Sequence, residues 1–151
     1  MQLIETVSYQ SAAPQVPSQL ADVRADPQAF LAIHALVKAQ TSLHFLRTAF
    51  VVLSDFGCVS HLDKVTEASR QKRIRPGNFT RMGPHTIATY LATAFQIHGP
   101  AFALVGNKNE HFPQACQIAN SLLQSSIVDI VCLVMSSPSE CTINLYRSED
   151  K

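Results

Sequence analysis

Short apolar runs alternate with helical stripes along this chain, which is the pattern of an α/β protein. Three nearly continuous apolar runs cover residues 49–54, 101–105 and 127–135. Runs of this kind predict strands that are buried on both faces, as in parallel sheets. A short first strand is expected over residues 3–9. Residues 141–147 alternate apolar and polar side chains, which predicts an edge strand with one wet face.

Apolar residues recur at the helical period between these runs. Asp26-Pro27 predicts the start of a helix that ends near Gln40, because Asp caps exposed N–H groups and Pro suits the first helical position. A short, mostly exposed helix is expected over 61–71, another from Pro84 to a stop at Gly99-Pro100, and another over 110–124. The pattern therefore predicts an α/β fold with a five-stranded mixed sheet, mostly parallel, whose last strand returns as a hairpin and runs antiparallel.

Composition fits one soluble domain. The chain has 151 residues, of which 46% are hydrophobic and 15% are charged, and its formal net charge is +1. This excludes disorder as the dominant state and argues against a globally basic nucleic-acid binder. No apolar run reaches the roughly 20 residues of a membrane span, and no secretory leader is visible. The four widely spaced cysteines are therefore expected to be reduced thiols of a cytoplasmic protein. Residues 11–25 form a proline-bearing loop and residues 148–151 a polar tail.

Residues with catalytic or metal-binding potential are scattered. The six histidines form no HExxH motif and no zinc-like pairing with cysteine, so neither a metal nor a cofactor is expected. Cys58 and His61, just after a strand, have the residue types of a thiolate and its base, although their spacing is unspecific. Gly106-Asn107-Lys108 lies at a strand-to-helix turn, as a phosphate cradle would, but lacks the glycine-rich P-loop pattern.

One block, Pro76–Met135, resembles the amino-terminal half of β-ketoacyl synthases, the condensing enzymes of fatty-acid and polyketide synthesis. In that family a small-residue helix precedes a Gly-Pro pair and a strand, and the nucleophilic cysteine follows at the start of a long helix. The matching positions here are His85 (asparagine in the family), Ala88, Ala92, Ala94, Gly99-Pro100, Ala101–Val105 and Ile127–Met135. The resemblance extends at low similarity over most of the chain. It implies a single domain, residues 1–151, that forms one half of a thiolase-like fold.

The departures from the family bear on catalysis. Counted from Pro100, the nucleophile position falls on Lys108, which cannot form an acyl thioester. Ser136-Ser137 replace the family's glycine pair, and the family's second half has no counterpart in this sequence. The chain is therefore not expected to be a condensing ketosynthase on its own. If a small enzyme reuses the half-fold to cyclise or decarboxylate an acyl intermediate, Lys108, Glu110, His111 and His85 are the candidate groups.

Two segments are candidate interaction sites. In the resembled family the strand before the nucleophile pairs across a dimer axis. The matching strand, made of Ala101, Phe102, Ala103, Leu104 and Val105, is expected to be an unprotected edge that pairs in a homodimer or in a heterodimer with a ketosynthase.

The second is a basic segment with no acidic residue across 70–81, formed by Arg70, Lys72, Arg73, Arg75 and Arg81. It would suit an acidic acyl carrier protein, although a solvated loop has the same composition. The function that these features favour is that of a pseudoenzyme, a non-catalytic accessory or scaffolding protein in polyketide or fatty-acid biosynthesis.

Overall fold

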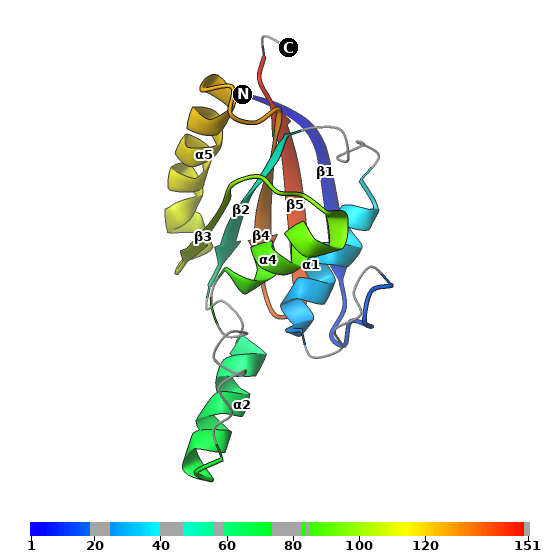
Figure 1. Ribbon diagram of the computed structural model, residues 1–151, viewed down its shortest axis with the longest axis vertical. Coiled ribbons are helices and arrows are strands. Elements are labelled where there is room, and N and C mark those ends of the chain that lie inside the picture. Colours follow the sequence, from blue (N-terminus) through cyan, green and yellow to red (C-terminus); the bar gives the residue numbers. More distant parts are fainter. Residues whose placement is uncertain (19–24, 40–46, 56–58, 74–82, 84, 150–151) are drawn as a thin grey trace.

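A five-stranded sheet carries helices on both of its faces (Figure 1). The computed structural model describes residues 1–18, 25–39, 47–55, 59–73, 83 and 85–149. Its elements are β1 (Gln2–Gln10), α1 (Pro27–Val37), β2 (Thr48–Ser54), α2 (Val59–Arg70), α4 (Thr86–Phe95), β3 (Ala101–Val105), α5 (Lys108–Gln124), β4 (Ile130–Ser136) and β5 (Glu140–Arg147).

The strand order is β1-β5-β4-β2-β3. β2 pairs in parallel with β3 and β4, and β5 pairs antiparallel with β4 and β1, so β5 alone runs against the others. This confirms the predicted mixed sheet. The prediction that residues 141–147 form an edge strand was wrong, because β5 lies between β1 and β4. The alternation in β5 arises because Cys141, Ile143 and Leu145 point into the core on one face of the sheet. The residues between them lie on the opposite face, where α5 packs on β2 and β4.

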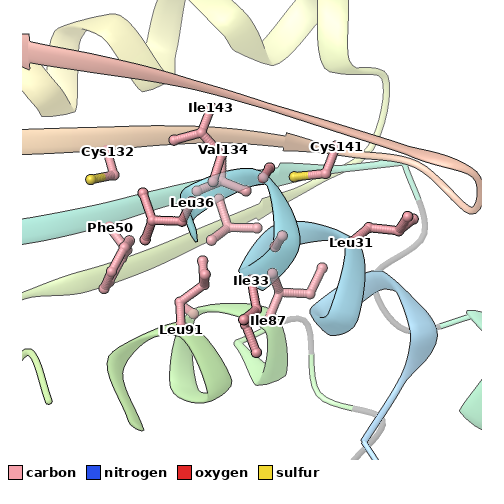
Figure 2. Close-up of a cluster of buried hydrophobic side chains, with 14 of the residues drawn as sticks. Leu31, Ile33, Leu36, Phe50, Ile87, Leu91, Cys132, Val134, Cys141 and Ile143 are labelled. Carbon is pink, nitrogen blue, oxygen red and sulfur yellow. The ribbon is translucent and has the colours of Figure 1, made fainter. Parts of the chain in front are cut away.

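The core has two parts, one on each face of the sheet. On one face α1 and α4 pack against the sheet through fully buried side chains that include Leu31, Ile33, Phe50, Ile87 and Leu91 (Figure 2). On the other face α5 packs through a smaller set that includes Val51, Leu53, Ala115, Ala119 and Leu133. β2 contributes alternate residues to each part. Its seven residues are all buried, which explains its uninterrupted apolar sequence.

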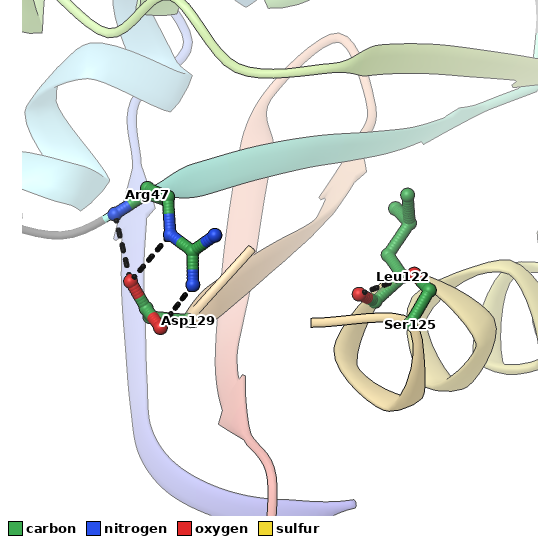
Figure 3. A network of polar contacts seen from close by, with 4 residues as sticks. All are labelled: Arg47, Leu122, Ser125 and Asp129. Carbon is green, nitrogen blue, oxygen red and sulfur yellow. Dashed lines mark hydrogen bonds and ion pairs between the residues drawn. The ribbon is translucent and has the colours of Figure 1, made fainter. Parts of the chain in front are cut away.

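An ion pair fixes the amino-terminal ends of β2 and β4 (Figure 3). The Asp129 carboxylate accepts hydrogen bonds from the Arg47 backbone N–H at 3.3 Å and from its guanidinium at 3.2 Å, and the Asp129 N–H donates to the Arg47 carbonyl at 2.7 Å. The strand predicted from residue 127 consequently begins at Ile130, and Ile127 is 52% exposed.

Gly99-Pro100 marks a close approach between two segments. A Cβ atom on Gly99 would overlap the carbonyl oxygen of Thr48, the first residue of β2. The Pro100 carbonyl then accepts the Phe50 N–H at 3.0 Å, which starts the pairing of β3 with β2. The predicted stop of α4 at this pair was wrong, because α4 already ends at Phe95, where Gln96 adopts a left-handed φ of 54°. The Gly-Pro pair instead seats the next strand on the sheet.

α2 extends away from the sheet (Figure 1). Of its described side chains, from Leu62 to Arg70, Val65 is buried and the others are largely exposed, in agreement with the predicted surface helix. None of the described helices has both the length and the apolarity that crossing a lipid bilayer requires.

Candidate functional site

The carboxyl ends of β2, β3 and β4 meet at one edge of the sheet, and the strand-to-helix elbow between β3 and α5 lies there. Gly106 follows β3, and its N–H donates to the Ser54 carbonyl of β2 at 3.1 Å. Its φ of 136° is strained for residues with a side chain. A Cβ atom here would also come within 2.7 Å of His111 Nε2. Glycine thus allows both the turn and the close packing of the His111 ring.

Side chains and backbone carbonyls within the elbow satisfy the first N–H groups of α5. Asn107 Oδ1 accepts the Asn109 N–H at 3.0 Å, and the Asn107 carbonyl accepts the N–H groups of Glu110 and His111 at 3.1 Å. The Lys108 N–H donates to Asp55 Oδ1 at 3.4 Å. Every N–H from Lys108 to His111 therefore has an acceptor within the chain. None of these four groups is free to stabilise an oxyanion or to bind a phosphate.

Asp55 also pairs with the Lys108 side chain. Lys108 Nζ lies 3.5 Å from Asp55 Oδ2, and the two side chains are 28% and 36% exposed. The Asp55 carboxylate occupies the place where a helix N-terminus attracts negative charge. Glu110, in the same turn, accepts a hydrogen bond from Asn107 Nδ2 at 3.1 Å. Two carboxylates and one ammonium thus form a structural cap on α5, which we call the elbow cap (Asp55, Asn107, Lys108 and Glu110).

The four candidate catalytic residues are only partly brought together. Lys108 is the first residue of α5, as expected, and Glu110 lies in the same turn. His111 is also there, but its Nδ1 lies 3.3 Å from Gln114 Oε1 rather than beside Lys108. His85 precedes α4, which covers the opposite face of the sheet from α5. The elbow is therefore one local cluster, and His85 is not part of it.

Ser136 and Ser137 are the two serines expected where the resembled family has a glycine pair. Among the described residues, neither forms a hydrogen bond with the elbow cap. Ser136 ends β4 beside Ser54 and is fully buried, and its hydroxyl has no hydrogen-bond partner among the described residues. Ser137 Oγ donates to the Glu140 carbonyl at 3.1 Å and so supports the turn before β5.

The described thiols are poor nucleophiles. Burial raises the pKa of Cys132 and of Cys141 from the ordinary 9.0 to about 12, and it also raises the pKa of the half-buried Cys116. Cys58 lies outside the described residues, as does the side chain of His61, so the thiolate–base hypothesis concerns atoms beyond them. Within the described ranges no three His, Cys, Asp or Glu side chains are grouped as metal ligands.

Part of the predicted basic segment lies at the end of α2. Arg70, Lys72 and Arg73 are exposed, and Arg70 forms an ion pair with Glu67 at 3.6 Å. Arg75 and Arg81 lie outside the described residues. Among the described strands, β3 pairs with β2 alone, so β3 is an edge strand of the sheet, as predicted. Two of its apolar side chains are exposed, Phe102 at 41% and Val105 at 43%.

Sequence reasoning missed Asp55 as a member of the site. The signal was its place, since an acidic residue directly after one parallel strand lies beside the elbow that follows the neighbouring strand. The spacing of the strands along the sequence could not show that β2 and β3 are neighbours in the sheet.

Comparisons with known proteins agree with this geometry at the level of fold. No protein-family profile and no curated protein sequence matches the chain. Thirteen chains of solved structures do match. One belongs to the complex of the ketosynthase ApeO with its chain length factor ApeC from Xenorhabdus doucetiae, with a TM-score of 0.67 and 12% identity over 97% of this chain and 79% of that chain. Another is a β-ketoacyl synthase from Burkholderia phymatum STM815, with a TM-score of 0.58 and 13% identity over 89% of this chain and 47% of that chain.

The chain therefore has a ketosynthase-like α/β fold, which confirms the predicted fold class. At sequence identities of 12% and 13%, these similarities show a shared fold alone. The chain spans less than half of the Burkholderia synthase but most of the matched chain from the Xenorhabdus complex. The matched Xenorhabdus chain is therefore only modestly longer than this one.

Proposed function

We propose that this chain is a non-catalytic, ketosynthase-like accessory subunit of a polyketide or fatty-acid-like pathway, and that it acts through a partner synthase. The observation that carries the proposal is the elbow cap. The position that resembles the family's nucleophile holds Lys108, whose ammonium is paired with Asp55. A paired ammonium has no lone pair with which to attack an acyl group. The helix N–H groups that could support such chemistry are already bonded within the chain.

The same contacts weigh against the alternative, a small enzyme that uses Lys108 for cyclisation or decarboxylation. Replacing Lys108 with Ala separates the two functions in a pathway reconstituted with its synthase and carrier protein. A structural subunit retains the rate of product formation after this change. A loss of product formation by a variant that still binds the synthase would overturn the proposal.

The exposed edge of β3 supports a partner that adds a strand to the sheet. The Phe50 N–H donates to the Pro100 carbonyl, and the Gly106 N–H donates to the Ser54 carbonyl. Because backbone groups alternate along a strand, Pro100, Phe102, Leu104 and Gly106 bond toward β2. Ala101, Ala103 and Val105 therefore turn their N–H and C=O groups toward the free edge. Such an edge pairs readily with another strand.

Ketosynthase partners provide the test of this edge. The chain is co-expressed with each complete ketosynthase of the same genome, and complexes are recovered by tandem purification. Replacing Ala103 with Pro removes an outward N–H without removing a bond to β2, so it should abolish the complex. Ala103→Ser keeps the N–H and is the matched control. Retention of the complex by folded Ala103→Pro protein would contradict strand pairing.

The basic segment supports a second contact, with an acyl carrier protein. Acidic carrier surfaces complement Arg70, Lys72 and Arg73, which are exposed at the end of α2. Charge reversal of Arg73 and Arg75 should weaken carrier binding and reduce its salt dependence, as measured by titration at two ionic strengths. Unchanged binding would refute this contact and would leave the pairing of β3 unaffected.

A further inference from the structure

The sheet has two outer strands, β3 and β1, and they lie on opposite sides of it (Figure 1). Among the described strands β1 pairs with β5 alone, so one side of this nine-residue strand has no strand beside it. Such an edge presents unpaired N–H and C=O groups to any other extended chain. The two edges differ in charge: β3 contains no charged residue, whereas a lysine from α1 reaches the edge of β1.

The hydrogen-bonding pattern of β1 shows which of its backbone groups point toward the free edge. In an antiparallel pair, residues that exchange hydrogen bonds alternate with residues that do not. The Ser11 N–H donates to the Ser139 carbonyl at 2.9 Å. Two residues earlier, Tyr9 and Cys141 are therefore also a hydrogen-bonded pair. Ser8 precedes Tyr9 and consequently turns its N–H and C=O groups away from β5, toward the free edge.

The other side of β5 leads to the same assignment. The Ser137 N–H donates to the Glu140 carbonyl at 2.8 Å, so the even-numbered residues of β5 form their hydrogen bonds with β4. Thr142 is one of these residues, and it lies opposite Ser8. Its backbone groups point toward β4, which leaves those of Ser8 without a partner on β5.

Lys38 covers the outward carbonyl of Ser8. It is the C-cap of α1, and its Nζ donates to the Ser8 carbonyl oxygen at 2.9 Å. The same ammonium lies 5.1 Å from the centre of the Tyr9 ring, at the distance of a cation–π contact. His34, one turn earlier on α1, stacks on that ring at 4.7 Å between centroids, and its Nε2 lies 3.0 Å from the Gln15 carbonyl oxygen. These contacts hold the Lys38 side chain across the edge of β1.

We propose that Lys38 closes the outer edge of β1, so that the chain does not pair with a second copy of itself through this strand. An incoming strand needs the Ser8 carbonyl as an acceptor and must displace an ammonium that is already bonded there. It would also enclose that positive charge beside its own backbone, which is costly. A bulge between Leu3 and Glu5 interrupts the regular ladder near the start of β1. The regular part of the edge is therefore the part around Ser8, where Lys38 lies.

Removing the ammonium tests this role. Each variant is built on Ala103→Pro, which blocks pairing through β3, and its dimerisation is compared with that parent by sedimentation. Lys38→Ala should lower the dissociation constant of the dimer by on the order of a hundredfold. A twofold pair of β1 strands then no longer displaces two ammonium groups, and each hydrogen bond to a charged group is worth at least about tenfold. Lys38→Arg keeps a cation at the edge and should behave as the parent. Lys64→Ala removes the same charge from an exposed position on α2 and is the matched control.

A second substitution locates the new contact. Ser8→Pro removes an outward N–H and no hydrogen bond to β5, so it should reverse the dimerisation of Lys38→Ala. Gln10→Pro does the same at the next outward residue and is used if Ser8→Pro does not fold. Hydrogen exchange at the Ser8 amide should be slower in the Lys38→Ala dimer than in the parent. The proposal is overturned if folded Lys38→Ala dimerises no more tightly than the parent, if Lys38→Arg or Lys64→Ala dimerises as tightly as Lys38→Ala, or if neither proline reverses the dimer.

These results are independent of the proposed function. Binding of the synthase is tested at β3, on the opposite side of the sheet, so the failure of either proposal leaves the other standing.

Discussion

Replacing Gly99 with Ala should destabilise the protein far more than glycine-to-alanine changes usually do. A Cβ atom at this position overlaps the Thr48 carbonyl oxygen and comes within 2.9 Å of the Thr48 carbonyl carbon. Neither atom can rotate away, since both belong to the backbone of β2, which is held between β4 and β3. Thr48 is itself 1% exposed and begins the pairing of β2 with β4. Relief of the overlap therefore requires β3 to separate from β2.

The size of the effect follows from what must give way. Overpacking in a rigid site costs about 1–3 kcal/mol, and loss of a backbone hydrogen bond that is left unsatisfied adds about 1–3 kcal/mol. The bond at risk joins the Phe50 N–H to the Pro100 carbonyl. We expect Gly99→Ala to lower the free energy of unfolding by about 3–5 kcal/mol. Domains have a total of only about 5–15 kcal/mol, so the variant should be marginally folded.

Urea unfolding followed by circular dichroism measures this loss, and Gly83→Ala is the matched control. At Gly83 a new Cβ meets the ring of His85, which is an exposed side chain that can rotate away. Gly83→Ala should therefore change stability by less than about 1 kcal/mol. Gly99→Ala should lower the urea midpoint by more than about 1 M. It should also accelerate hydrogen exchange at the Phe50 amide. Equal midpoints for the two variants would refute the steric argument.

Three other predictions concern an ion pair, a residue with a left-handed backbone conformation, and the buried thiols. Asp129→Ala should lower the urea midpoint more than Arg47→Ala, because only Asp129 also accepts the Arg47 backbone N–H, whereas the guanidinium is exposed; equal effects would contradict this. Ser126→Gly, at a residue with a φ of 54° after α5, should stabilise the protein by about 0.5–1 kcal/mol in thermal unfolding, since glycine adopts this conformation without strain. Stability should also fall as pH rises from about 9 toward 12, by about 1.4 kcal/mol per pH unit for each buried thiol, because Cys132 and Cys141 ionise near 9 in the unfolded chain and near 12 in the fold. Cys132→Ala should flatten this pH profile in urea titrations, and an unchanged slope would count against it.

The order of the elements could be predicted from the sequence because each has a strong local signal. β2 and β3 are apolar runs bounded by turns, and α1 has a capping Asp followed by Pro. Strand position was harder to predict. β5 alternates like an edge strand, yet β1 pairs along its outer side. Alternation reports which faces of a strand are buried, whereas edge position depends on a partner 130 or more residues away in the chain, such as Val7 opposite Ile143.

The elbow could be located from the sequence, but its chemistry could not. Lys108 lies at the start of α5, as the Gly-Pro spacing indicated. Considered alone, the dipole of α5 disfavours a cation at the first residue of the helix. That argument omitted Asp55, which contributes a carboxylate from the neighbouring strand. Electrostatic inferences from one element fail where the sheet brings an opposite charge from another, and that arrangement depends on strand order.

Asp55 also explains why the elbow cannot be regarded as a catalytic site with a single residue exchanged. A thiol at a helix N-terminus ionises easily because free N–H groups and the dipole stabilise the thiolate. Here Asp55 already accepts the first of those N–H groups, and a carboxylate at this distance would oppose a second negative charge. Lys108 balances that carboxylate. The two residues therefore depend on each other, and restoring a cysteine alone would create two adjacent anions.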